Sequence, residues 1–312
     1  MPRPLVLLTT KVPSSVLGTL EAACDVDYND AGPLAHHALV ERVRGKNGLI
    51  CVFSDAVSRD VLDAGRELKV ISTIAVGYNN IDVAAARERG IVVTNTPDVV
   101  TEATADLTWA LIMDITRRIS EGDRLVRRGG WKGWTFDFML GTELRGKQLG
   151  IIGYGRIGRA VAARATAFGM RVAYTGRQPA ADPMALPLDR LLASSDVVSI
   201  HCPLTPDTRH LINQASLARM KRSAYLINAS RGPVVEEAAL AWALKNRIIS
   251  GAALDVYEDE PRVHAELLTL ENVVLVPHLG SATTETRTAM ADLAVRNAVA
   301  VLTGEQPVTP AK

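Results

Sequence analysis

The sequence predicts an α/β fold with parallel sheets. Short apolar, β-branched runs alternate with longer helical patterns along the chain, and this alternation is typical of strand–helix–strand units. Several runs are apolar at nearly every position, as expected for strands that helices cover on both faces. The predicted strands are Leu5–Leu8, Gly48–Val52, Val70–Ile74, Val92–Thr94, Gln148–Ile152, Arg171–Tyr174, Val197–His201, Tyr225–Asn228, Gly251–Leu254 and Val273–Val276.

A length of 312 residues suggests about two domains. We expect a boundary after Pro97, because proline disfavours a helix at the preceding residue and a long helical pattern, Thr101–Arg128, begins soon afterwards. The last helical pattern, about Thr284–Leu302, could return to the first domain. We therefore predict one domain from residues 1–97 plus 284–312, and a second from residues 98–283.

Composition excludes several classes of function. A net charge of +1 and an aromatic content of 4% argue against a nucleic-acid binder. No apolar run approaches the ~20 residues that span a membrane. Cys24, Cys51 and Cys202 form no C-x-x-C pair and suit the reducing cytoplasm. We therefore predict a cytoplasmic protein. His36-His37 and His201-Cys202 lack the spacing of metal ligands, so we predict no metal site.

A glycine-rich turn, Gly153-Tyr154-Gly155-Arg156-Ile157-Gly158, follows one predicted strand and opens the predicted helix Arg156–Phe168. In this arrangement the first glycine makes a tight turn, the second lets the backbone approach a pyrophosphate, and the third lets helix and strand pack closely. The N–H groups at the helix N-terminus bind the anion. The alternative is a coincidental glycine-rich turn, but the strand–turn–helix context favours a dinucleotide site.

The next strand indicates which nicotinamide cofactor binds. A site for NAD usually has Asp or Glu ~20 residues after the first glycine, bonded to the ribose 2′-hydroxyl. Here the strand is followed by Thr175-Gly176-Arg177-Gln178-Pro179, and no acid occurs before Asp182. Gly176 leaves room, and Arg177 offers a planar fork for a phosphate. Arg177 could instead be a solvated turn residue, but the pattern as a whole favours NADP.

Arg231, Glu260 and His278 each follow a predicted strand of the second half. Ligands of open α/β sheets bind at the carboxyl ends of strands. Taken singly, each residue could be structural. Together they suit a 2-oxo acid, because an arginine can bind the carboxylate and polarise the ketone, and a histidine can protonate the growing alkoxide. A nearby carboxylate stabilises the imidazolium.

These features resemble the D-isomer-specific 2-hydroxyacid dehydrogenase family over nearly the whole chain. Within the family the sequence most resembles the glyoxylate/hydroxypyruvate reductases and the similar 2-ketogluconate reductases. The matching segments, in order, are residues 72–82, 95–97, 153–158, 228–232, 254–256, 260–261 and 277–282.

The resemblance implies a Rossmann cofactor domain and a flavodoxin-like substrate domain, both doubly wound. It also implies reduction of glyoxylate or hydroxypyruvate by NADPH, with NADH as a secondary cofactor. Arg231 would bind the substrate, and His278 would donate the proton with Glu260 as its partner. A homodimer is implied, with the helix from Thr101 at its interface. Further substrate-binding residues would be the N–H groups of Val76 and Gly77, and Phe53 and Trp134, the last reaching a neighbouring subunit.

The same resemblance implies a set of cofactor-binding residues. Arg156 and Ile157 would present amides to the pyrophosphate, Cys202 and Pro203 would line the adenine, and Asp255 would bind the nicotinamide carboxamide. The full set is Thr101, Gly153, Gly155, Arg156, Ile157, Gly158, Gly176, Arg177, Gln178, Cys202, Pro203, Thr208, Ala229, Ser230, Asp255, His278, Gly280 and Ser281.

Two alternative functions stay open. A 2-ketogluconate reductase would need a longer pocket, which depends on loop shape near Phe53 and Trp134. A dinucleotide-sensing regulator is the alternative from another class. The intact set of Arg231, Glu260 and His278 and the lack of a charged tail argue against the regulator.

Overall fold

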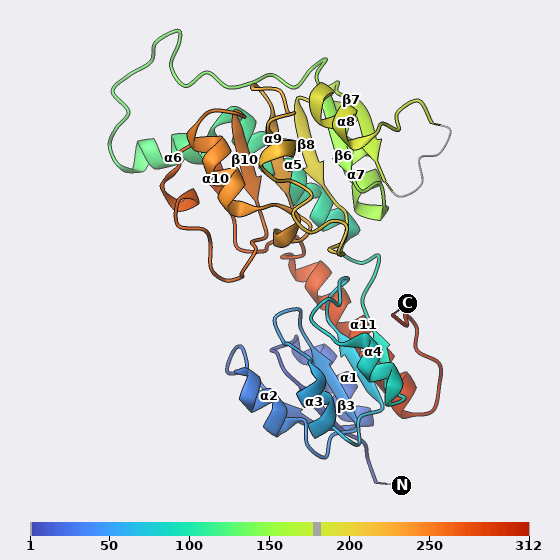
Figure 1. Cartoon of the computed structure of the whole chain (residues 1–312). Coiled ribbons are helices and arrows are strands. Elements are labelled where there is room, and N and C mark those ends of the chain that lie inside the picture. Colours follow the sequence, from blue (N-terminus) through green and yellow to red (C-terminus); the bar gives the residue numbers. More distant parts are fainter. Residues whose placement is uncertain (1, 177–181, 312) are drawn as a thin grey trace. The chain divides into compact units, whose positions relative to one another are not determined.

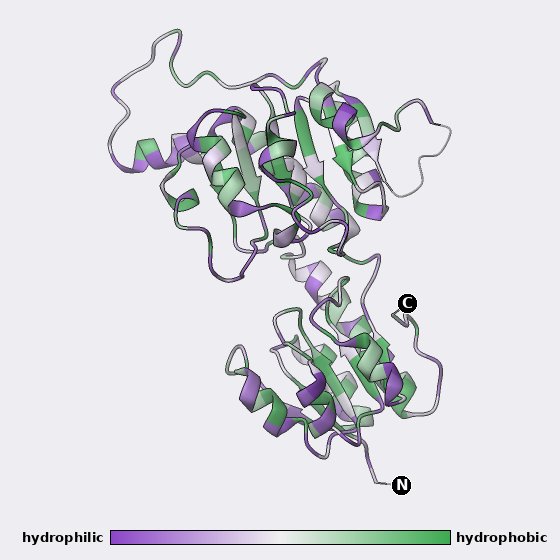
Figure 2. Ribbon diagram, viewed as in Figure 1, coloured by the Kyte–Doolittle hydropathy of each residue, from purple (hydrophilic) through white to green (hydrophobic). Residues whose placement is uncertain are grey.

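The computed structural model describes residues 2–176 and 182–311 and divides the chain into two compact units (Figure 1). Unit 1 runs to Val100 and resumes at Thr283, and unit 2 comprises Thr101–Ala282. The predicted boundaries, after residues 97 and 283, lie next to these divisions. Figure 2 shows hydrophobic residues along most strands of both sheets, where helices cover them.

The sheet of unit 1 has the strand order β2-β1-β3-β4-β5, and each neighbouring pair is parallel. This is the flavodoxin-like order of doubly wound folds. The sequence did not predict β2, because its DVDY segment alternates charged and apolar residues at the sheet edge instead of forming an apolar run. The strands are β1 (Leu5–Leu8), β2 (Asp25–Tyr28), β3 (Gly48–Cys51), β4 (Val70–Thr73) and β5 (Val92–Thr94).

Helices cover both faces of this sheet. Val6 and Leu8 pack against α1 and α11, whereas Leu7 between them packs against α2, α3 and α4. This separation follows from the alternation of side chains along a strand. The C-terminal helix α11 therefore belongs to the core of unit 1. The helices are α1 (Ser14–Ala23), α2 (His36–Arg42), α3 (Arg59–Ala64), α4 (Val83–Glu88) and α11 (Thr284–Leu302).

The sheet of unit 2 has the order β11-β10-β9-β8-β6-β7, again with parallel pairs throughout. After β7 the chain returns to the other side of β6, so the winding reverses between β6 and β8. Ligands of doubly wound sheets bind outside such a reversal, at the carboxyl ends of the strands. The strands are β6 (Gln148–Ile152), β7 (Arg171–Thr175), β8 (Val197–Ile200), β9 (Tyr225–Asn228), β10 (Gly251–Leu254) and β11 (Val273–Leu275).

Two apolar clusters flank this second sheet. One contains Ile112 and Val161 and packs α5 and α7 on the sheet, and the other contains Leu191 and Leu240 and packs α8 and α10 on the opposite face. The helices are α5 (Thr101–Arg117), α6 (Ile119–Arg127), α7 (Arg156–Ala165), α8 (Leu188–Ser194), α9 (Gln214–Leu217) and α10 (Glu237–Lys245).

The prediction of one helix from Thr101 to Arg128 is wrong, because Arg118 adopts a left-handed conformation with φ of 58° and separates α5 from α6. The turn is held by side chains. Asp114 accepts hydrogen bonds from the backbone N–H and the hydroxyl of Ser120, and Arg118 pairs with Glu121. Propensity along the sequence does not reveal such a break, since every residue of the segment other than Gly122 is compatible with a helix.

The segment from α6 to β6 runs as a long irregular chain outside the sheet of unit 2 (Figure 1). It exposes large apolar side chains, with 57% of Trp131, 75% of Trp134 and 86% of Phe136 accessible. Helix α6 has no buried residue. Among the residues that the structure describes, no helix is both long and apolar enough to cross a bilayer.

Candidate active site

The three glycines of the turn after β6 occupy different environments. Gly153 has a φ of 97°, and a Cβ there would meet the Cys202 nitrogen at 2.5 Å. A Cβ at Gly158 would meet the Gly153 oxygen at 2.2 Å, so helix and turn pack without space for a side chain. Gly155 faces open space, with nothing within 4 Å of its Cβ position. Because only the middle glycine is free of protein contacts, this turn fits the approach of a pyrophosphate.

Helix α7 begins directly at this opening. Its N-cap is Gly155, whose hydrogen atom in place of a side chain leaves the first turn without a side-chain cap. The first N–H groups of a helix lack partners within the helix and carry its positive dipole end. The residues present therefore suit a bound phosphate group, which matches the dinucleotide site that the sequence predicts.

Other predicted cofactor residues lie at the same edge of the sheet. Gly176 follows β7 directly, and the nearest atom to its Cβ position is the Tyr154 nitrogen at 3.9 Å. Arg177 and Gln178 lie outside the described residues. Cys202 is buried just after β8, next to the exposed Pro203. The Thr208 hydroxyl donates to the Pro203 carbonyl at 2.7 Å, so it shapes the loop after β8.

The turn after β9 is organised from within by Asn228. This fully buried side chain donates to the Arg231 carbonyl at 3.0 Å and accepts from the backbone and hydroxyl of Ser230. Gly232 lies against the chain after β10, and a Cβ there would fall 1.7 Å from the Tyr257 oxygen. These contacts fix the backbone of Arg231, a half-buried residue, between the two strand ends.

His278 and Glu260 form a contact pair at the same edge. The Nδ1 of His278 lies 2.8 Å from Glu260 Oε2, and about a quarter of each side chain is exposed. His278 has a φ of 53°, and its backbone N–H donates to the Asp255 carbonyl. The structure thus brings the predicted histidine and glutamate together, although they lie in separate loops after β10 and β11.

Asp255 has a contact that the sequence reasoning did not predict. Its carboxylate is buried and accepts hydrogen bonds from the backbone N–H groups of Leu279 and Gly280, at 2.5 and 2.9 Å. The Thr104 hydroxyl donates to the Gly280 carbonyl. Asp255 therefore holds the loop that contains His278. In the sequence, this role is indicated by a carboxylate at the end of an apolar strand, because a buried carboxylate needs hydrogen-bond partners.

The charges of the three residues influence one another. Burial by itself raises the pKa of the Glu260 carboxyl, but the hydrogen bond from His278, with the charges of His278 and Arg231, brings that pKa below its ordinary value. Burial lowers the pKa of the Arg231 guanidinium, and Glu260 opposes this effect. An arginine remains protonated in proteins. The site therefore combines a carboxylate, a guanidinium and an imidazole.

Unit 1 carries three of the predicted substrate-binding residues. Asn95 donates from Nδ2 to the Val76 carbonyl at 2.7 Å. The C=O and N–H of a trans peptide point in opposite directions, so this bond also sets the direction of the Gly77 N–H. Asn80 donates to the Val52 and Asp55 carbonyls and holds the loop of Phe53, whose exposure is 42%.

The remaining predicted residues lie in unit 2. Thr101 opens α5, Ala229 is buried directly after β9, and Ser281 follows Gly280. Trp134 lies in the irregular segment after α6. Among the described residues, no group of three or more His, Cys, Asp or Glu side chains is arranged to hold a metal ion.

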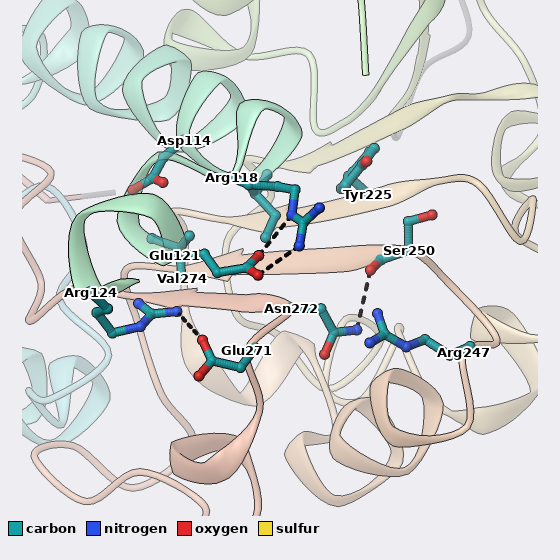
Figure 3. Close-up of a pocket in the computed structure, with 11 residues that line it drawn as sticks. Asp114, Arg118, Glu121, Arg124, Tyr225, Arg247, Ser250, Glu271, Asn272 and Val274 are labelled. Atoms are coloured by element: carbon teal, nitrogen blue, oxygen red, sulfur yellow. Dashed lines mark hydrogen bonds and ion pairs between the residues drawn. The ribbon is translucent and has the colours of Figure 1, made fainter. Parts of the chain in front are cut away.

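A separate pocket of about 290 Å³ lies in unit 2 at the amino-terminal ends of β9, β10 and β11, opposite the strand ends that carry the predicted site residues (Figure 3). Two ion pairs form part of its lining: Arg118 binds Glu121, and Arg124 binds Glu271. None of the predicted site residues lines this pocket. The other residues around it are Asp114, Ile115, Tyr225, Arg247, Ser250, Asn272 and Val274.

Comparison with known proteins gives full-length relatives. A glyoxylate reductase from Thermofilum pendens is 46% identical, and the match covers 98% of this chain and 94% of the relative. A solved protein from Thermus thermophilus superposes with a TM-score of 0.94 at 46% identity, covering 99% and 100% of the two chains. An NADPH-dependent glyoxylate/hydroxypyruvate reductase from Sinorhizobium meliloti, solved with NADP and malonate, gives 0.90 at 35% identity, covering 99% and 97%.

The model of the D-isomer specific 2-hydroxyacid dehydrogenase NAD binding domain matches residues 109–280, which include the glycine turn and all three charged residues. The two-sheet α/β architecture is that of the solved relatives. The expectation drawn from the sequence is confirmed at this level: the chain belongs to the D-isomer-specific 2-hydroxyacid dehydrogenase family and is an NAD(P)-dependent oxidoreductase.

Proposed function

We propose that this protein reduces glyoxylate or hydroxypyruvate with NADPH. The main support is the contact between His278 and Glu260 at 2.8 Å, at the carboxyl ends of the strands, where Arg231 and the glycine turn also lie. An imidazole held by a carboxylate beside a guanidinium suits protonation of an anionic substrate. Relatives of this chain with the names glyoxylate reductase and glyoxylate/hydroxypyruvate reductase support this substrate class.

Each side chain has a distinct role in this proposal. Arg231 binds the substrate carboxylate and polarises the ketone. A bound nicotinamide supplies the hydride. Glu260 accepts a hydrogen bond from the Nδ1–H of His278, which fixes the orientation of the ring and leaves Nε2 to donate the proton. The resulting 2-hydroxy acid has gained one hydride at carbon and one proton at oxygen.

The choice of NADPH depends on the chain after β7. Gly176 provides open space where a carboxylate would otherwise meet the ribose, and Arg177 and Gln178 follow it. The relative from Sinorhizobium meliloti is described as NADPH-dependent and was solved with NADP. NADH is the secondary cofactor in this proposal. The cofactor would further contact Thr101, Gly153, Gly155, Arg156, Ile157, Gly158, Cys202, Pro203, Thr208, Ala229, Ser230, Asp255, Gly280 and Ser281.

The activity is tested by following nicotinamide absorbance with glyoxylate, hydroxypyruvate and 2-ketogluconate in turn. We expect oxidation of NADPH with the first two acids, and a roughly 10²–10⁴-fold lower kcat for His278→Asn, because a positioned acid contributes that much. The Kd for NADPH should change far less than kcat, because the proton donor acts mainly in the chemical step. Oxidation only with 2-ketogluconate would identify a sugar-acid reductase, and no oxidation with any acid would support a dinucleotide-binding regulator.

The Glu260 carboxylate should set the pH range of reduction. Its pKa lies below the ordinary value, so it is ionised at neutral pH and stabilises the imidazolium of His278. In Glu260→Gln this charge is absent, so the protonated ring of His278 loses its anionic partner. We expect the alkaline fall of kcat/KM to move down by about one pH unit. A profile that coincides with that of the wild type would remove Glu260 from the proton-transfer step.

Cofactor preference is tested at Arg177. If its guanidinium binds the 2′-phosphate, Arg177→Ala should raise the KM for NADPH about tenfold or more while hardly affecting the KM for NADH, since a charge-assisted bidentate contact is lost only with NADPH. The measurement is a pair of cofactor titrations at saturating glyoxylate. Equal effects on both cofactors would contradict the assignment.

We also propose a homodimer. Trp131, Trp134 and Phe136 are exposed apolar side chains on the irregular segment of unit 2, and a second copy of this chain could cover them. We expect sedimentation velocity to show a dimer, and the triple substitution of these residues by Ser to shift it toward monomer. A wild-type monomer at all concentrations would refute the proposal.

We place the protein in the cytoplasm. Its three free cysteines, all buried, are compatible with that location.

A further inference from the structure

The loop that carries Glu260 is fastened at both ends by one buried carboxylate. Glu237, the first residue of α10, is 5% exposed. Its Oε1 accepts the backbone N–H of Glu258 at 2.5 Å, and its Oε2 accepts the backbone N–H of His264 at 2.9 Å. A single side chain therefore joins the two positions between which Glu260 lies.

A second glutamate, Glu258, binds the backbone of Glu237 in turn. The Glu258 carboxylate accepts the backbone N–H of Glu237 at 2.9 Å, and its other oxygen lies 2.6 Å from His210 Nε2. Glu237 and Glu258 thus exchange hydrogen bonds between side chain and backbone in both directions. The site lies at the N-terminus of α10, where negative side chains interact favourably with the helix dipole.

The same loop contacts the proton donor by two routes. Glu260 accepts the backbone N–H of Tyr257 through Oε1 and contacts His278 through Oε2, at 3.1 and 2.8 Å. The Tyr257 hydroxyl donates to the Val276 carbonyl at 2.9 Å, close to His278 in the chain. The position of Glu260 against the imidazole therefore depends on where the loop ends are held.

We propose that Glu237 is a positioning residue for the reaction: it sets the Glu260 carboxylate against His278 by fastening both ends of residues 258–264. This inference rests on the proposed function, since it assumes that His278 donates the proton. Glu237 touches neither substrate nor cofactor in this scheme. A neutral glutamine could not replace it, because the glutamine side chain offers one oxygen and one NH₂ group, and the NH₂ would face a backbone N–H.

The test uses the full-length enzyme with Glu237→Gln. One loop end loses its acceptor, so Glu260 should stabilise the imidazolium less well. We expect kcat with glyoxylate to fall about tenfold or more, and the alkaline fall of kcat/KM to move to lower pH, in the direction expected for Glu260→Gln. The Kd for NADPH should stay unchanged. Glu236→Gln is the matched control, because the structure records no side-chain bond for Glu236, and it should behave as the wild type.

The double variant separates positioning from general damage. If Glu237 acts through Glu260, adding Glu237→Gln to Glu260→Gln should produce no further shift of the pH profile, whereas independent effects would add. An unshifted profile for Glu237→Gln, with or without a lower kcat, would overturn the proposal and leave a purely structural role. A wild type inactive with all three acids would instead refute the proposed function.

A variant that does not fold would be recognised by circular dichroism. In that case Glu258→Gln takes its place, because it weakens the same end of the loop from the other side of the reciprocal pair. We expect a smaller shift of the pH profile in the same direction. No shift in a folded, active Glu258→Gln enzyme would overturn the proposal.

Discussion

The buried side chains of Asn228 and Asp255 must find hydrogen-bond partners at the carboxyl edge of an apolar sheet. Both find them in the backbone of the chain that follows. Asn228 bonds the turn of Arg231, and Asp255 bonds the N–H groups after His278. The requirement to pair buried polar atoms thus directs two loops into fixed conformations, and the positions of the arginine and the histidine follow from it.

Steric contact adds a second constraint. The turn containing Gly232 lies so near the Tyr257 peptide that no side chain fits between them. Tyr257 in turn bonds the backbone before His278. The loops after β9, β10 and β11 therefore form one connected assembly, in which Glu260 is held from several directions. Close packing of this kind allows three residues that are far apart in the sequence to share one site.

Sequence patterns lead directly to a prediction where a residue type has one obvious use. The glycine turn and the order of Arg231, Glu260 and His278 needed only local pattern and their places after strands. Roles that depend on a distant partner were not predictable: Glu237 looks like an ordinary helix residue until the chain brings Glu258 and His264 to it. Edge strand β2 was missed because its DVDY segment is not an apolar run, and the break at Arg118 was missed because helix propensity does not show local side-chain bonds such as Asp114 to Ser120.

The path of the chain also imposes an order on biosynthesis. Unit 2 is continuous from Thr101 to Ala282, whereas unit 1 needs α11 to cover Val6 and Leu8 and needs Thr309 to bond Asn95. A ribosome delivers those segments only after all of unit 2 has emerged. The half that begins the chain is therefore the half completed last, and the part of its apolar sheet face that α11 covers stays exposed throughout the synthesis of the other half.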